Sequence, residues 1–168
     1  MPTQTCVRFE VESNREVPDV ATIEECSITL PAEPASIKKA RDFVGRTVAG
    51  HVDDPTEVLL MTSELVSNVV GHVGSMVTIT VRDGPLVRIE VHNHEAATQA
   101  FQDLLRDSPR PANTSLTGRG LGIVRSLASR VGLDDDPGRG KVVWFEWEHP
   151  GDQGNAVLEA DGETVAIA

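Results

Sequence analysis

The sequence predicts a two-layer α/β (α+β) sandwich in which helices cover one face of a mixed, mainly antiparallel sheet. Three observations lead to this fold class. Segments with apolar residues at helical intervals are interspersed with segments in which apolar and polar residues alternate one by one. A strong turn signal, Asp83-Gly84, joins two of the alternating segments as an antiparallel hairpin. The chain has 168 residues, 39% of them hydrophobic, which is enough for the core of one domain.

The N-terminal part of the chain predicts an extension, a short strand and a helix. Residues 1–25 are polar and acidic, and we expect an N-terminal extension there that includes a short alternating segment of Val7, Phe9 and Val11. Residues 27–30 alternate as the first strand of the domain, with an open edge to which a second copy of the chain can pair. Residues 34–50 have apolar side chains at helical intervals and predict the first helix.

The second predicted helix, residues 55–73, is the segment around which the rest is organised. Acidic residues precede Pro55, and proline is favourable at the first helical position. Glu64, Asn68 and His72 are each four residues apart, so they stack on one side of an otherwise apolar helix. These polar groups are either solvated or locally bonded at the edge of the buried face, or directed into a cavity that holds a ligand. The helix by itself favours the first interpretation.

The remaining elements follow in order. Residues 76–82 and 86–91 are the two strands of the predicted hairpin. Residues 93–117 show no periodicity, and a connection of this length is usually functional or disordered. Residues 120–131 predict the third helix, and residues 142–147 predict the last strand.

Composition limits the classes of function. We expect one domain at residues 26–148, followed by an acidic, mobile tail at residues 149–168. A net charge of −11 repels phosphate backbones and argues against direct nucleic-acid binding. No apolar run has the length of a membrane span or of a signal core, so we expect a cytoplasmic protein without membrane association. Cys6 and Cys26 lack the spacing of a metal site, and we expect reduced thiols.

Glycines at the start of the third helix predict an anion site. Gly118, Gly120 and Gly122 let the backbone approach a phosphate, and the N-terminus of a helix favours negative charge. No apolar strand precedes them, which excludes a dinucleotide-binding fold, and no Gly-Lys-Ser/Thr sequence follows, which excludes a P-loop. The glycines instead close a long loop, as a lid over a nucleotide does.

These motifs, taken in order, resemble the GHKL ATP-binding superfamily. The resemblance rests on residues 64–72, the hairpin and long loop, residues 118–124 and residues 137–144, and it covers about residues 26–148. Within the superfamily, the chain is similar to the small anti-sigma-factor serine/threonine kinases of bacteria. The resemblance implies a Bergerat-type ATP-binding fold, ATP and Mg²⁺ as cofactors, and a homodimer. It also implies two partners, a sigma factor and an antagonist (anti-anti-sigma) protein that is phosphorylated on serine.

The resemblance also assigns roles to residues. Glu64 matches the glutamate that acts as a base towards the substrate hydroxyl, and Asn68 matches the asparagine that holds Mg²⁺. Arg119 adds positive charge beside a transferring phosphoryl group. The nucleotide-binding residues that the resemblance implies are Asn68, His72, Asn93, Gly118, Arg119, Gly120, Leu121 and Gly122.

Two positions depart from the pattern of the family. Asn93 stands where the family usually has an aspartate that accepts from the adenine amino group, and Val142 stands where it commonly has a threonine. An asparagine oxygen still accepts a hydrogen bond but is neutral, so we expect weak ATP binding. The alternative is a degenerate module that sequesters a partner without phosphoryl transfer. A detached histidine-kinase-like ATPase domain is disfavoured because no phosphoacceptor helix precedes the fold.

Two further groups of residues have simple explanations. His92 and His94, with His72, resemble a metal site only loosely, because no third ligand has a fixed spacing, and partly exposed histidines at a strand end explain them better. Trp144 and Trp147 fall on opposite faces of the last strand, and we expect them to be packing residues.

Overall fold

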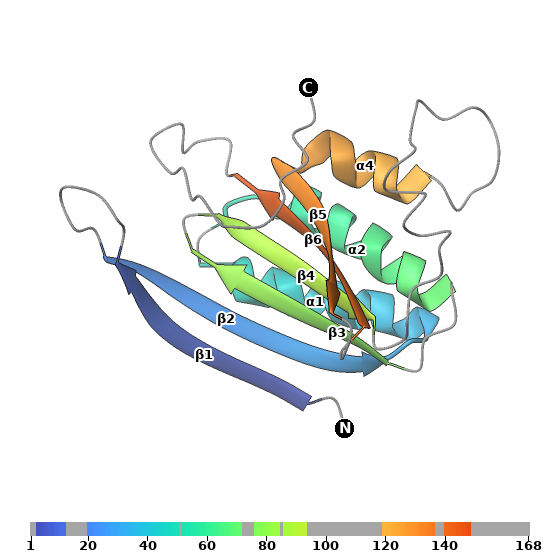
Figure 1. Cartoon of the computed structure of the whole chain (residues 1–168), viewed down its shortest axis with the longest axis horizontal. Helices are drawn as coiled ribbons and strands as arrows, with labels where there is room; N and C mark the ends of the chain where they lie inside the picture. Colours follow the sequence, from blue (N-terminus) through green and yellow to red (C-terminus); the bar gives the residue numbers. More distant parts are fainter. Residues whose placement is uncertain are drawn as a thin grey trace.

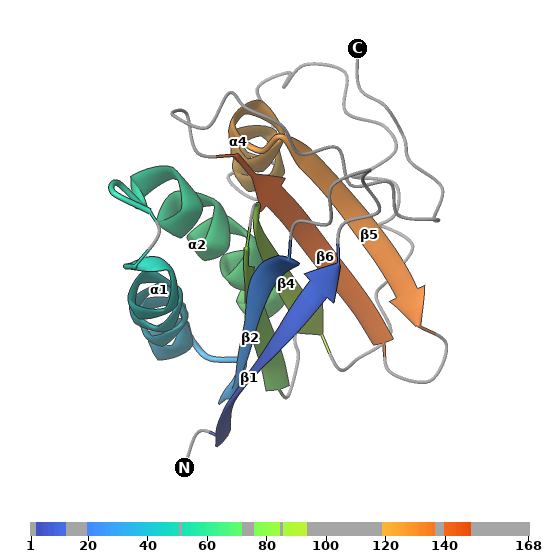
Figure 2. The same cartoon turned by 90° about the vertical axis from the view of Figure 1, so that its left-hand side faces the viewer.

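A six-stranded sheet carries three helices on one face in the computed structural model (Figures 1 and 2). The structure describes residues 3–12, 20–50, 52–71, 76–84, 86–93, 119–136 and 140–148. The expected two-layer sandwich is confirmed. The expected mainly antiparallel sheet is confirmed as well, since every pair of neighbouring strands in these ranges is antiparallel.

The sheet has the strand order β1-β2-β3-β4-β6-β5. Its strands are β1 (Thr3–Glu12), β2 (Val20–Pro31), β3 (Met76–Asp83), β4 (Val87–Asn93), β5 (Arg130–Asp136) and β6 (Gly140–Trp147). The predicted hairpin is β3–β4. β4 next pairs with β6, a strand from the far end of the domain, and this pairing brings α4 beside α2 (Figure 1).

The helices are α1 (Pro34–Val48), α2 (Thr56–Gly71) and α4 (Arg119–Leu127). At the start of α2, Asp54 Oδ1 accepts hydrogen bonds from the Thr56 N–H at 3.0 Å and from the Thr56 hydroxyl at 2.6 Å. This cap confirms the predicted beginning of the helix. In the described ranges, no helix combines the length and the apolar character needed to cross a bilayer.

The third helix is shorter than predicted. α4 ends at Leu127, and the backbone N–H of Ser129 donates to the carbonyl of Glu146 at 2.9 Å, which brings the chain onto β6. Val131 and Leu133 then alternate as strand residues packed against the core. The prediction of a helix to residue 131 is therefore wrong, because pairing with a distant strand overrides local helical spacing.

The core lies between the sheet and the helices. Val77, Ile79 and Val81 of β3 are fully buried, whereas Thr78 and Thr80 between them are only half-buried, so alternate side chains face the helices. The largest fully buried side chains come from both layers and include Phe43, Met61, Leu65, Ile89 and Phe145. Among the described elements, the helices thus cover one face of the sheet.

β1 covers the sheet edge that the sequence leaves open. The alternating N-terminal segment forms this strand, and Thr3 to Thr5 pair with Thr29 to Ser27 of β2. The expected open edge at residues 27–30 is therefore wrong, because β1 takes the place proposed for a second copy. Dimerisation itself stays a prediction.

Cys6 and Cys26 form a disulfide between β1 and β2. They are direct partners in the strand register, with their Cα atoms 4.1 Å apart. The expectation of two unpaired, reduced thiols is wrong. Their spacing along the chain gives no sign of this pairing, which depends on the register of the two strands.

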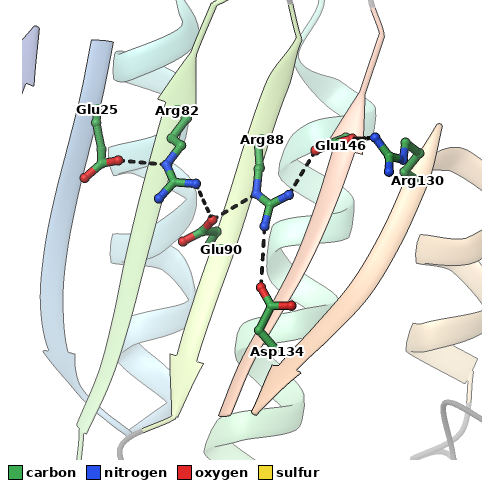
Figure 3. Close-up of polar contacts among 7 residues, drawn as sticks. All are labelled: Glu25, Arg82, Arg88, Glu90, Arg130, Asp134 and Glu146. Carbon is green, nitrogen blue, oxygen red and sulfur yellow. Dashed lines mark hydrogen bonds and ion pairs between the residues drawn. The ribbon is translucent and has the colours of Figure 1, made fainter. Parts of the chain in front are cut away.

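A chain of ion pairs crosses the sheet face without helices (Figure 3). Arg88 is its centre, with partners on three strands and its guanidinium carbon 3.9 Å from the centroid of the Trp144 ring. Burial opposes the charge of Arg82, but the hydrogen bond to Glu25 and the nearby carboxylates raise its pKa. The nitrogen–oxygen distances are Arg82–Glu25 2.7 Å, Arg82–Glu90 2.9 Å, Arg88–Glu90 2.9 Å, Arg88–Glu146 3.0 Å, Arg130–Glu146 3.3 Å and Arg88–Asp134 3.6 Å.

Candidate functional site

The candidate site begins where Glu64 of α2 meets Gly120 of α4. Glu64 is half-buried and Gly120 is buried. A Cβ atom added to Gly120 would overlap Glu64 Oε2 and lie 3.3 Å from the Cβ of Glu64. Only glycine therefore fits here without displacing the carboxylate, and the structure brings together two residues that are 56 positions apart in the sequence.

The Glu64 carboxylate lies beside the first turn of a helix. α4 begins at Arg119, so Gly120 belongs to the turn whose N–H groups have no partners within the helix. These groups, with the helix dipole, make such a turn favourable for anions. A potential proton acceptor and a potential phosphate-binding turn are thus adjacent.

Asn68 lies one helical turn beyond Glu64 on α2. Its Nδ2 atom is buried and has no hydrogen-bond partner among the described residues. A buried amide group without a partner costs about 1–3 kcal/mol, so its retention calls for an explanation. Rotation of the amide by 180° exchanges its nitrogen and oxygen, and an amide oxygen at this place is a suitable ligand for a hard cation such as Mg²⁺. The residues present therefore fit a magnesium-bound phosphate compound.

The residues after Gly120 differ in their surroundings. Leu121 is buried in the hydrophobic core and anchors the start of α4. Gly122 is exposed, and a Cβ atom added there would meet nothing within 4 Å. Of these two glycines, only Gly120 is thus required by packing within the described structure.

Asn93 ends β4 on the side of the sheet that faces the helices. Its register partners are Val77 of β3 and Lys141 of β6, both buried, and it continues the alternation of Val87, Ile89 and Val91. The sequence did not single out Lys141. Its buried position beside Asn93 follows from the pairing of β4 with β6. In the sequence, the only indication of this role is that Lys141 directly precedes the apolar run of the last strand.

Val142 does not belong with Asn93. It pairs with His92 of β4 and Asp134 of β5, on the sheet face without helices. The expectation that Val142 replaces an anchor for the nucleotide base is therefore wrong, since it points to the other face. Val142 is therefore no argument for weak ATP binding, and Asn93 is the one of the two departures that still concerns the nucleotide site.

Several expected site residues lie outside the described residues. These are His72, His94, Gly118 and the side chain of Arg119. The same holds for residues 94–118, on which the expectation of a lid rests, and for the tail at residues 149–168. Their roles stay predictions.

Both tryptophans and one of the three candidate histidines, His92, lie within the described residues. His92 lies on the helix-free face, away from α2. Within the described ranges, the one cluster of metal-ligating side chains is Cys6, Glu24 and Cys26, whose two sulfurs are bonded to each other. The expected placement of the tryptophans on opposite faces is confirmed: Trp144 stacks on Arg88, and buried Trp147 donates to Glu57 Oε2 at 2.9 Å.

Comparison with known protein families agrees with this geometry. The family model of the histidine kinase-like ATPase domain matches residues 30–147, which is most of the chain and includes α2, the hairpin, α4 and β6. No curated protein matches the chain. The chain therefore belongs to the family of histidine kinase-like ATPase domains.

Proposed function

We propose that this protein is an anti-sigma regulatory factor with ATP-dependent serine/threonine kinase activity. Membership of the family supports an ATPase or kinase type of function. The finer proposal is that the protein binds a sigma factor and phosphorylates a serine of an antagonist protein, which controls transcription. It rests on the site and on the resemblance of its motifs to those of the anti-sigma kinases.

The observation that carries the proposal is the contact of α2 with the first turn of α4. It brings the Glu64 carboxylate against Gly120, one helical turn from the unpartnered amide of Asn68. A proton acceptor, an anion-binding turn and an oxygen ligand for a hard cation then lie together. This is the set of groups that phosphoryl transfer to a hydroxyl requires.

Each group has a distinct role in the proposed reaction. Glu64 would take the proton of the serine hydroxyl as the oxygen of that hydroxyl bonds to phosphorus, while the bond from phosphorus to the bridging oxygen breaks and ADP leaves. Asn68 holds Mg²⁺ through its amide oxygen, and the first turn of α4 binds phosphate oxygens through its N–H groups. MgATP, when bound, supplies the phosphoryl group and a metal that neutralises its developing charge.

The remaining parts of the proposal are a cytoplasmic location and a homodimer. Both are supported by the resemblance to the anti-sigma kinases. Among the described strands, the outer edges of the sheet belong to β1 and β5, so a strand-mediated dimer must use one of these instead of β2.

A second function stays possible because of Asn93. This neutral amide stands at the helix-facing end of β4, where the family usually has a carboxylate. A protein with the same fold and weak or absent nucleotide binding would sequester its regulatory partner without phosphoryl transfer. Val142 no longer supports this alternative.

The test of the kinase function is transfer of phosphate from MgATP to an antagonist protein, detected as the mass of one added phosphate on serine. Glu64→Gln keeps the size of the side chain and removes its basicity, so we expect the transfer rate to fall by about 10²-fold or more with ATP affinity nearly unchanged. Glu33→Gln, the same change at an exposed residue, is the control. Transfer that continues at the wild-type rate in Glu64→Gln would exclude Glu64 as the base.

A further inference from the structure

Strand β1 attaches to the sheet without burying any described side chain. All the side chains described in this strand, from Thr3 to Phe9, are exposed, including Val7 and Phe9, which are 50% and 40% accessible. In the sheet order, its one neighbour is β2. It also lies outside the part of the chain that matches the family. The hydrophobic effect, which holds the other strands, therefore contributes little to this one.

Among the described side chains of β1, two kinds of contact add to its backbone pairing. Arg8 forms an ion pair with Glu24 at 3.1 Å, in which the arginine side chain is 70% accessible, and exposed pairs of this kind contribute little. The other contact is the Cys6–Cys26 disulfide. The described side chains of β1 therefore add little to its backbone pairing apart from this disulfide, which ties the strand covalently to β2.

The disulfide is placed where a thiol can reach it. Cys6 is on the exposed outer strand, whereas Cys26 is buried at 3% accessibility, next to the core. Attack by a thiolate on the sulfur of Cys6 forms a mixed disulfide and releases the thiolate of Cys26. The second thiol of a dithiol reductant then displaces Cys6, so that the dithiol leaves as a cyclic disulfide and two electrons and two protons pass to the protein.

We propose that Cys6 and Cys26 form a thiol–disulfide redox site that holds β1 on the sheet when oxidised and releases it when reduced by a dithiol. Release uncovers the backbone groups of β2 that β1 pairs with, from Val20 to Thr29. An uncovered strand edge is a surface for pairing with another extended segment. The oxidation state of this pair therefore controls access to one edge of the sheet.

The test is hydrogen exchange of the folded, full-length protein before and after reduction by dithiothreitol, with free thiols counted in parallel. We expect no free thiol in the oxidised protein and two after reduction. Amides of β1 should then exchange faster by about tenfold or more, because the covalent constraint on this strand is lost. Amides of Val77, Ile79 and Val81 in the core strand β3 are the internal control and should keep their protection.

Cys6→Ser/Cys26→Ser is the matched variant, and its β1 exchange should equal that of the reduced wild type with or without dithiothreitol. Four results would overturn the proposal. Thiols that stay free after treatment with oxidised glutathione would do so, as would a disulfide that resists the dithiol while the protein stays folded. Equal protection of β1 in the oxidised and the reduced protein would show that the disulfide does not hold this strand. Loss of β3 protection together with that of β1 would show that reduction affects the whole sheet instead of β1 alone.

Discussion

At the scale of single residues, the site depends on a glycine that admits a carboxylate. Glu64 is half-buried on a largely apolar helix, and the absence of a side chain at Gly120 leaves the space that its carboxyl group occupies. The sequence shows both residues but not that they touch. Their contact explains why a charged residue persists on this face of α2.

The first prediction concerns Gly120→Ala. The new methyl group displaces the flexible end of Glu64, so the fold should persist at a cost of about 1–3 kcal/mol in the free energy of unfolding. Phosphoryl transfer should fall more than ATP affinity, since the base is moved. Denaturant unfolding and transfer assays check this.

The control is Gly122→Ala, which adds its methyl group in open space on a helix and should stabilise the protein by up to about 1 kcal/mol. Equal effects of the two substitutions on stability would contradict the described packing.

The second prediction uses the unpartnered amide of Asn68. Asn68→Ala removes a side chain whose buried Nδ2 atom has no hydrogen-bond partner in the described structure, so the protein should be about as stable as the wild type. MgATP affinity should fall by about tenfold or more, because an oxygen ligand of the metal is lost. Ser67→Ala, at the adjacent position on α2, is the control for changes in the helix itself. A loss of stability without a loss of MgATP affinity would assign Asn68 to the fold instead of the site.

At the scale of elements, helix starts illustrate what local sequence determines. The Asp54–Thr56 cap of α2 was predictable because it involves residues two positions apart. The hydrogen bonds from the hydroxyl and the N–H of Thr56 lower the pKa of Asp54. A carboxyl group with a lowered pKa in the folded state stabilises the fold above its unfolded-state pKa of about 3.9, and this contribution is lost as the pH falls through the lower, folded value.

The third prediction follows from the lowered pKa of Asp54. Asp54→Ala should lower the thermal midpoint at neutral pH, and the difference from the wild type should shrink as the pH falls below about 4. Thermal unfolding followed by circular dichroism from pH 2 to pH 7 measures this. Asp53→Ala, at the neighbouring exposed carboxylate, is the control and should lower the midpoint at neutral pH by less. A difference between Asp54→Ala and the wild type that stays constant across this range would contradict the cap.

The fourth prediction concerns the contact of β5 with β6. A Cβ atom added to Gly132 would overlap the indole ring of Trp144, which in turn lies under Arg88. A rigid ring cannot yield as a flexible side chain does, so Gly132→Ala should cost about 1–3 kcal/mol and change the tryptophan fluorescence. The contact of Trp147 with Glu57 should be unaffected. An unchanged spectrum and unchanged stability would mean that Trp144 does not lie over β5.

At the scale of the whole molecule, the sequence predicted the parts that depend on near neighbours. The three helices, the β3–β4 hairpin and the last strand were found because periodicity and turn signals are local. The disulfide, strand β5 and the covering of β2 by β1 were missed, since each depends on pairing between distant segments. Register also decided that Asn93 faces the helices and Val142 does not. The same limit explains why the Glu64–Gly120 contact required a structure.

The central claim is that the site around Glu64 and Asn68 binds MgATP. Isothermal titration of the oxidised, folded protein with ATP in the presence of Mg²⁺ tests it most directly. We expect one site per chain with a Kd between about 1 µM and 1 mM, weaker without Mg²⁺ and weaker in Asn68→Ala. Asn93→Asp should bind more tightly, because a charged acceptor makes the stronger hydrogen bond. No binding of ATP, ADP or GTP by the folded wild type, and none restored by Asn93→Asp, would contradict the claim and leave the sequestering function.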